Sequence, residues 1–201
     1  MKNFFIKNNY TSRKNFLHYD DTKNTDGWQK EVYLEARSFM QKYDLNNVID
    51  IGCGSGYKLV KYFKEYNTTG LEVECNLDFL NSKYPSHQWL KSDFNNPQNL
   101  KTDIVICADV IEHLINPDML MEYIKTFKFK FAFISTPDRD LHYHPNNPGY
   151  NGPPGNKTHI REWNSPEFNQ YISSHLKVID HKITNRSQST QLIICTDKTI
   201  D

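Results

Sequence analysis

The sequence has no excess of charge of either sign. Lys and Arg together number 24, and Asp and Glu together also number 24, so the formal net charge is zero. Proteins that bind nucleic acid usually present a basic face, because contacts to phosphate supply much of the affinity. The balance of charge therefore argues against a nucleic-acid partner.

The sequence also lacks paired cysteines and long apolar runs. None of its four cysteines lies in a Cys-x-x-Cys pair, so no zinc knuckle or dithiol redox motif is readable. Only three consecutive apolar residues occur near the N-terminus, too few for the core of a signal peptide, and no membrane-length run follows. We therefore expect free thiols, a cytoplasmic location and no membrane segment.

Length and patterning predict one domain preceded by an arm. Residues 1–26 are polar and rich in Asn and Lys, which predicts a loosely ordered, flexible N-terminal arm, and residues 27–201 are long enough for a single domain. Apolar positions at helical spacing within 27–43 predict a lead-in helix. Its residues Trp28, Gln29 and Tyr33 are candidates for a lid that folds over a ligand. The alternative is that Trp28 and Tyr33 pack in the hydrophobic core.

Strands and helices alternate along the middle of the chain. Apolar runs at 48–51, 68–73, 87–90, 103–107 and 131–135 predict strands, and segments 57–66, 77–84 and 117–127 predict helices. Such alternation indicates parallel βαβ units, whereas the runs at 177–184 and 191–196 lie too close together to pair in parallel. The predicted fold is α/β, a Rossmann-like seven-stranded, mostly parallel sheet with helices on both faces and an antiparallel last strand.

A long proline-rich segment interrupts this rhythm at about residues 137–164. It contains five of the nine prolines, and a loop of this length in a compact domain is usually functional or disordered. After it, Ser165 as the cap and Pro166 in the first turn predict the start of another helix.

Residues 48–56, which read Val-Ile-Asp-Ile-Gly-Cys-Gly-Ser-Gly, predict a ligand-binding loop between a strand and a helix. Glu72 follows Gly52 by twenty positions, which in a βαβ unit places a carboxylate beside the ribose of a bound nucleoside. A dinucleotide loop requires glycine where Tyr57 stands, and Asp50 would repel a phosphate. S-adenosylmethionine, which carries an ammonium and a sulfonium and no phosphate, suits this acidic loop better than NAD does.

Four motifs in the right order carry a resemblance to a known family: residues 48–56, 70–73, 92–94 and 109–114. Residues 48–56 resemble the first motif of class I S-adenosylmethionine-dependent methyltransferases, and residues 109–114, Asp-Val-Ile-Glu-His-Leu, resemble the signature of their ubiquinone-biosynthesis-like small-molecule branch. The resemblance covers residues 45–135 and, by topology, the final hairpin. It implies methyl transfer from S-adenosylmethionine to a small molecule.

The resemblance also implies roles for particular residues. Glu72 corresponds to the ribose-binding acid, Asp93 and the backbone beside it to the adenine contact, and Asp109 to a position near the amino-acid end of the cofactor. For the side chain of Cys53, a buried thiol is the favoured interpretation. The implied cofactor-binding residues are Asp50, Gly52, Cys53, Gly54, Glu72, Asp93, Phe94 and Asp109.

The histidines are candidates for catalysis, because an alcohol acceptor must lose a proton during methyl transfer. His113 follows the fourth predicted strand and His159 lies in the proline-rich segment, so either is a candidate base, and a structural role for His113 stays open. His142 and His144 lie near His159 in sequence, but no acid or cysteine completes a metal-ligand spacing, and no metal site is predicted.

The acceptor is indicated by residues 135–163. Their Ser-Thr-Pro-Asp-Arg-Asp start and later Gly-Pro-Pro and His-Ile-Arg-Glu-Trp elements resemble methyltransferases associated with glycan biosynthesis. The resemblance implies small-molecule O-methylation of a sugar or nucleotide-linked sugar. It predicts that Arg139, His144, Arg161 and Trp163 bind the substrate, unless Arg161 pairs locally and Trp163 only anchors the loop.

Three other functions compete with this one. A nucleic-acid amino-methyltransferase would carry an Asn/Asp-Pro-Pro-aromatic tetrad after the fourth strand, where the sequence instead reads Asp-Val-Ile-Glu. An NAD-dependent oxidoreductase is disfavoured by Tyr57, and a non-catalytic cofactor-binding module remains an alternative. The oligomeric state is left open.

Overall fold

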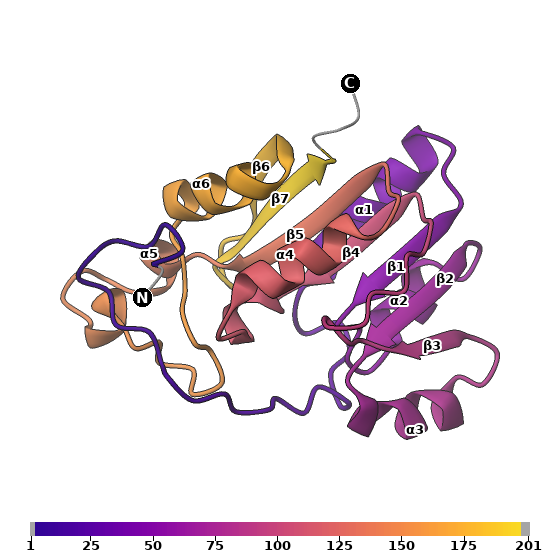
Figure 1. The fold of residues 1–201 in the computed structure, drawn as a ribbon, viewed down its shortest axis with the longest axis horizontal. Helices are drawn as coiled ribbons and strands as arrows, with labels where there is room; N and C mark the ends of the chain where they lie inside the picture. Colours follow the sequence, from indigo (N-terminus) through magenta and orange to yellow (C-terminus); the bar gives the residue numbers. More distant parts are fainter. Residues whose placement is uncertain (1–2, 198–201) are drawn as a thin grey trace.

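The computed structural model describes residues 3–197, which build a twisted seven-stranded sheet with helices on both faces (Figure 1). The strand order is β3-β2-β1-β4-β5-β7-β6, and β7 runs in the direction opposite to the other six strands. The fold predicted from the sequence is therefore confirmed. The strands are β1 Asn47–Ile51, β2 Asn67–Glu72, β3 Gln88–Lys91, β4 Ile104–Ala108, β5 Phe131–Pro137, β6 Lys177–Asn185 and β7 Thr190–Thr196.

Two hydrophobic cores lie on opposite faces of the sheet because the central strands are apolar on both sides. On one face, α1, α2 and α3 cover alternate strand residues such as Ile104 and Phe133. On the other face, α4 and α6 cover their neighbours, such as Val105 and Ile134. The helices are α1 Lys30–Lys42, α2 Tyr57–Tyr62, α3 Glu74–Lys83, α4 Pro117–Lys125, α5 Arg139–His142 and α6 Ser165–His175, with 3-10 turns η1 Ile111–His113 and η2 Pro148–Asn151.

The proline-rich segment is folded rather than structureless. Asp138 caps α5 by accepting hydrogen bonds from the amides of Asp140 and Leu141, and Asn147 caps η2. The predicted boundaries of three helices were wrong, and α3 begins at Glu74 instead of residue 77. Helix α2 ends at Tyr62 instead of residue 66, and the cap of α6 is Asn164, which forms a capping box with Glu167, not Ser165.

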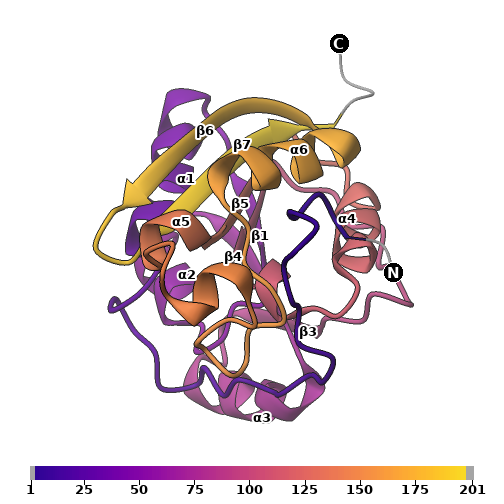
Figure 2. The ribbon, with the colours of Figure 1, turned by 90° about the vertical axis from the view of Figure 1, so that its left-hand side faces the viewer.

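The N-terminal arm lies across the carboxyl ends of the parallel strands (Figure 2). Near its start, the carbonyl of Phe4 accepts a hydrogen bond of 2.9 Å from the indole of Trp163, and Ile6 is buried. Near its end, the carbonyl of Thr25 accepts one of 3.2 Å from the Lys58 ammonium on α2. The arm therefore connects the proline-rich segment with the glycine loop. Within residues 3–197, no helix has the length and apolar character needed to span a membrane.

Candidate functional site

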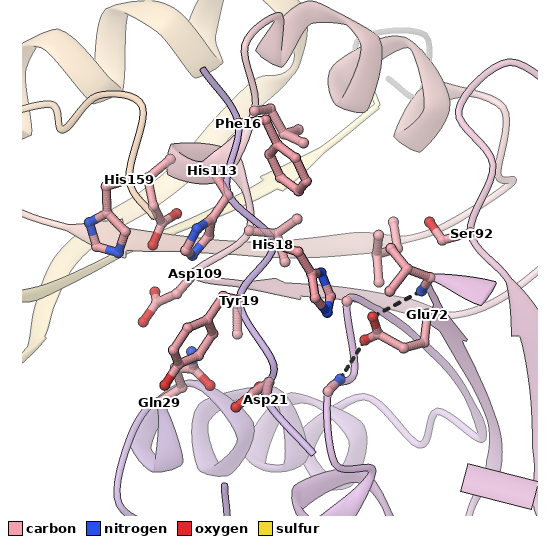
Figure 3. Close-up of a pocket in the computed structure, with 18 of the residues that line it drawn as sticks. Phe16, His18, Tyr19, Asp21, Gln29, Glu72, Ser92, Asp109, His113 and His159 are labelled. Carbon is pink, nitrogen blue, oxygen red and sulfur yellow. Dashed lines mark hydrogen bonds between the residues drawn. The ribbon is translucent and has the colours of Figure 1, made fainter. Parts of the chain in front are cut away.

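A cavity of about 680 Å³ opens at the carboxyl end of the parallel strands, between the sheet and the N-terminal arm (Figure 3). Strand β1 has β2 on one side and β4 on the other, so the chain crosses over in opposite directions on either side of this point. Open α/β sheets bind ligands at such a switch point, because the diverging crossovers leave a crevice there. The cavity therefore lies where the fold alone predicts a ligand.

The glycine loop after β1 forms the floor of the cavity. Gly52 and Gly54 line it, and both have positive φ angles, of 71° and 55°. A Cβ at Gly52 would lie 2.5 Å from the side chain of Val110, and one at Gly54 would lie 2.1 Å from the Asp21 carboxylate. Both positions therefore require glycine, for the backbone conformation as well as for space.

Glu72 stands at the carboxyl end of β2 with its carboxylate held in place. One oxygen accepts a hydrogen bond of 2.7 Å from the Gly54 amide, and the other accepts one of 2.9 Å from the Val73 amide (Figure 3). Burial raises the pKa of this carboxyl. The oxygen bound to Val73 also accepts a longer hydrogen bond of 3.4 Å from the Asn76 side chain, whereas the oxygen bound to Gly54 retains a lone pair that can accept a hydrogen bond from a ribose hydroxyl.

Asp93 and Phe94 line the same end of the cavity, after β3. The Asp93 carboxylate accepts hydrogen bonds from the Asn95 amide and the Asn96 side chain, at 3.0 and 2.9 Å, and these bonds lower its pKa. The ring of Phe94 packs on Tyr123 with 5.1 Å between ring centroids. The loop therefore offers a fixed acid and a ring where the adenine contact was predicted.

Asp109 follows β4 and has a φ of 55°, which is unusual for a residue other than glycine. The Ser135 hydroxyl donates a hydrogen bond of 2.6 Å to its carboxylate, and burial raises the pKa of the group. Backbone strain of this kind is typical of functional sites, where neighbouring structure holds it in place. Figure 3 shows Asp109 beside the two histidines, at the side of the cavity opposite Glu72.

His113 and His159 meet at the other end of the cavity although 46 positions separate them in sequence. Their rings lie 4.8 Å apart, centroid to centroid, at 89°. His113 pairs through Nδ1 with the Thr158 carbonyl at 3.0 Å, and His159 pairs through Nδ1 with the Glu162 carboxylate at 2.5 Å. Burial and the neighbouring His159 lower the pKa of His113 to about 4. Both predicted catalytic residues thus face one space.

Two predicted cofactor residues lie beneath the glycine loop and do not line the cavity. Asp50 is buried and accepts a hydrogen bond of 2.8 Å from the Tyr33 hydroxyl. Cys53 is also buried, and its sulfur lies 2.9 Å from where a Cβ on Gly70 would stand. Their side chains support the loop, so direct cofactor contact is corrected for both, and the buried-thiol interpretation of Cys53 holds.

The four residues predicted to bind the substrate do not line the cavity. Arg139 is 1% exposed and forms a two-pronged ion pair with Glu167, at 2.6 and 3.1 Å. Arg161 donates to two backbone carbonyls after η1, and Trp163 is fully buried and anchors the arm. His144 is exposed on the surface. The local pairing of Arg161 and the anchoring role of Trp163, left open above, are what the structure shows.

Several residues that line the cavity lie on the N-terminal arm and were not predicted as site residues. Phe16, His18, Tyr19 and Asp21 cross in front of the cavity, and the ring of Tyr19 stacks over His113 at 6.1 Å (Figure 3). Trp28 and Gln29 also line the cavity, as the lid interpretation expected, whereas Tyr33 is in the core. The arm lacks periodicity, so only its scattered aromatic residues hinted at contact with a ligand.

A seven-stranded sheet ending in an antiparallel strand, with a glycine loop and a strand-end acid beside it, defines the nucleoside-binding fold of class I methyltransferases. A model of the methyltransferase domain family matches residues 18–181, and the chain belongs to this family. The family uses S-adenosylmethionine, which is therefore the cofactor. No curated protein sequence matches the chain.

Solved structures show the same fold at low sequence identity. An S-adenosylmethionine-dependent methyltransferase from Clostridium acetobutylicum is 15% identical, with a TM-score of 0.63 over 84% of this chain and 91% of that one. One from Aquifex aeolicus is 16% identical, with a TM-score of 0.62 over 89% and 98%. Magnesium protoporphyrin IX methyltransferase from Synechocystis, solved with bound S-adenosylmethionine, is 11% identical, with a TM-score of 0.61 over 84% and 79%.

Proposed function

We propose that the protein methylates a hydroxyl group of a sugar, with S-adenosylmethionine as the donor. The observation that carries the proposal is the continuity of the cavity, which runs from the Glu72 carboxylate to the paired histidines His113 and His159. When bound, S-adenosylmethionine supplies an electrophilic methyl group, and transfer to a hydroxyl leaves S-adenosylhomocysteine and one proton. A site for this reaction needs a nucleoside end and a proton-handling end, and the cavity has both.

The cofactor end is assigned from its charge and shape. Glu72 faces the ribose, Asp93 and Phe94 the adenine, and the flat floor of Gly52 and Gly54 admits the methionine part. Asp21 on the arm and Asp109 after β4 add carboxylates to this part of the cavity. This concentration of acids suits a cofactor with two cationic groups and opposes a pyrophosphate, which disfavours the oxidoreductase alternative.

The acceptor end is assigned from its aromatic rings and histidines. Trp28, which is 52% exposed, and Tyr19 both line the cavity, and exposed aromatic faces suit the apolar face of a sugar ring. His113 and His159 are the groups placed to act on the hydroxyl. Among residues 3–197, no arginine lines the cavity, and the one lysine that does, Lys91, stands at the end of β3 and pairs with Glu74. Within this range, the acceptor end therefore has no lysine or arginine for a phosphate, which favours a sugar or glycan over a nucleotide-linked sugar. The glycan-associated resemblance of residues 135–163 supports the same choice.

The test begins with calorimetric titration of the wild type with S-adenosylmethionine and, separately, with NAD. We expect micromolar binding of S-adenosylmethionine only, and at least tenfold weaker binding in Glu72→Ala because the ribose loses its acceptor. Glu65→Ala, which removes an exposed acid outside the cavity, is the control and should bind normally. Tight binding of NAD would overturn the cofactor assignment.

Release of S-adenosylhomocysteine then identifies the acceptor. A panel of free sugars, oligosaccharides and nucleotide-linked sugars should show turnover with a sugar hydroxyl, and loss of turnover in His113→Ala at unchanged cofactor affinity. Turnover only with amines would contradict the hydroxyl assignment. Cofactor binding without turnover on any acceptor class would favour the non-catalytic module.

A further inference from the structure

Glu112, His113 and His159 form a cluster of potential metal ligands at the acceptor end of the cavity. One ligand atom from each lies within 4.8 Å of the other two, and all three residues line the cavity. Glu112 and His113 belong to η1, whereas His159 comes from the proline-rich segment. The amide of Ile160 donates a hydrogen bond of 2.8 Å to the Glu112 carbonyl, so backbone pairing fixes the two segments together.

The Glu112 carboxylate is only partly satisfied in this arrangement. The residue is fully buried, and one oxygen accepts a hydrogen bond of 3.1 Å from the Thr136 hydroxyl. Among the described residues, the other oxygen has no hydrogen-bond partner. A buried acceptor without a partner carries an unrecovered desolvation cost, which a bound cation would remove.

Both imidazoles are oriented as in metal-bound histidines. A histidine ligand usually donates its second ring N–H to a carbonyl or a carboxylate, which fixes the ring and its tautomer. Here Nδ1 of His113 faces the Thr158 carbonyl and Nδ1 of His159 faces the Glu162 carboxylate, which leaves Nε2 of each ring for a metal. The Asn156 amide lies 2.9 Å from Nε2 of His159, and this exposed side chain would turn aside when an ion binds.

We propose that Glu112, His113 and His159 bind one divalent transition-metal ion, of the Zn²⁺ or Mn²⁺ type, with open positions facing the cavity. Two imidazoles and one carboxylate suit such ions, whereas Mg²⁺ prefers an all-oxygen shell. The sequence analysis missed the site because its acid lies 47 positions before His159. The binding of the ion does not depend on the reaction assigned above.

The role of the ion rests on the proposed function. Its open positions take the acceptor hydroxyl, whose O–H bond is weakened by coordination. The proton passes to solvent as the oxygen forms its bond to the methyl carbon, and the electron pair of the broken S–C bond stays on sulfur. The two histidines then act on the hydroxyl through the ion and not as free bases.

Metal binding is tested on the full-length chain after treatment with EDTA and dialysis. Mn²⁺ titration followed by electron paramagnetic resonance, and Zn²⁺ titration followed by calorimetry, should show one strong site per chain. We expect at least tenfold weaker binding in Glu112→Gln and in His113→Ala. His142→Ala removes a histidine that lines the same cavity outside the cluster, and it should bind the ions as the wild type does.

The variants separate this proposal from the proposed function. Glu112→Gln should lose the metal but bind S-adenosylmethionine normally, and Glu72→Ala should do the reverse. Circular dichroism will show whether Glu112→Gln is folded. If it is not, the metal site is tested by the affinity of His113→Ala and by the nitrogen hyperfine signal of Mn²⁺ bound to the wild type. Absence of a strong site in the wild type, or equal affinity in all variants, would overturn the metal site and leave the cofactor result intact.

Discussion

Gly54 illustrates how single residues shape the cavity. Its amide donates to Glu72, its φ is positive, and the Asp21 carboxylate of the arm rests against the face where a side chain would project. One small residue therefore positions the ribose acid and admits the arm at the same time.

We expect Gly54→Ala to lower the free energy of unfolding by about 1–2 kcal/mol, because an L-residue is strained at this φ. It should also weaken S-adenosylmethionine binding, since the new methyl group displaces Asp21. Urea denaturation and calorimetry measure the two effects. Gly27→Ala is the matched control, because a Cβ at Gly27 meets no atom within 4 Å, and it should leave both quantities unchanged.

Among the elements, the N-terminal arm is the one that closes the cavity. Its residues 14–20 are exposed on one side, while Phe16, His18 and Tyr19 face the cavity on the other. A ligand beneath them would add contacts that hold the arm in place, and bound ligands stabilise the states that they bind.

We expect S-adenosylmethionine to slow tryptic cleavage after the exposed Lys14 and Lys23 severalfold. Mass spectrometry of the fragments over time measures the rate at each site. NAD at the same concentration is the control and should give no protection. Equal cleavage rates with and without S-adenosylmethionine would show that the arm does not cover the cofactor.

The elements also show what the sequence could and could not predict. Glu72 was predicted from its spacing to the glycine loop in a βαβ unit, and Asp109 from the family resemblance of the motif that follows β4; both signals are local in sequence. The contacts of Arg139 and Trp163 could not be predicted because their partners are distant: Glu167 lies 28 positions after Arg139, and Phe4 lies 159 positions before Trp163. No local pattern encodes such contacts.

For the whole molecule, stability depends on a buried acid beneath the glycine loop. Burial raises the pKa of Asp50 from its ordinary value of 3.8 to about 7, and the Tyr33 hydroxyl that donates to it opposes the shift only in part. A raised pKa means that the folded state prefers the protonated carboxyl. The stabilisation is therefore complete below pH 3.8 and is lost as the pH rises through about 7.

We expect Asp50→Asn, which cannot ionise, to become more stable relative to the wild type by roughly 1–3 kcal/mol between pH 5 and pH 8. Chemical denaturation of the cofactor-free protein at a series of pH values measures the difference. A constant difference across this range would show that Asp50 titrates at its ordinary pKa. Asp44→Asn, at an exposed position, is the control, and its difference in stability from the wild type should not change between pH 5 and pH 8.

The position of the arm has a consequence for synthesis on the ribosome. The partners of its first half, including Asn151, Ile160 and Trp163, are made about 140 to 160 residues later. Because these partners precede β6 and β7 in the chain, this half of the arm can dock only after β1 to β5 and the proline-rich segment have been made. Until then the nascent protein has its ligand crevice open, and the cofactor can enter before the arm is in place.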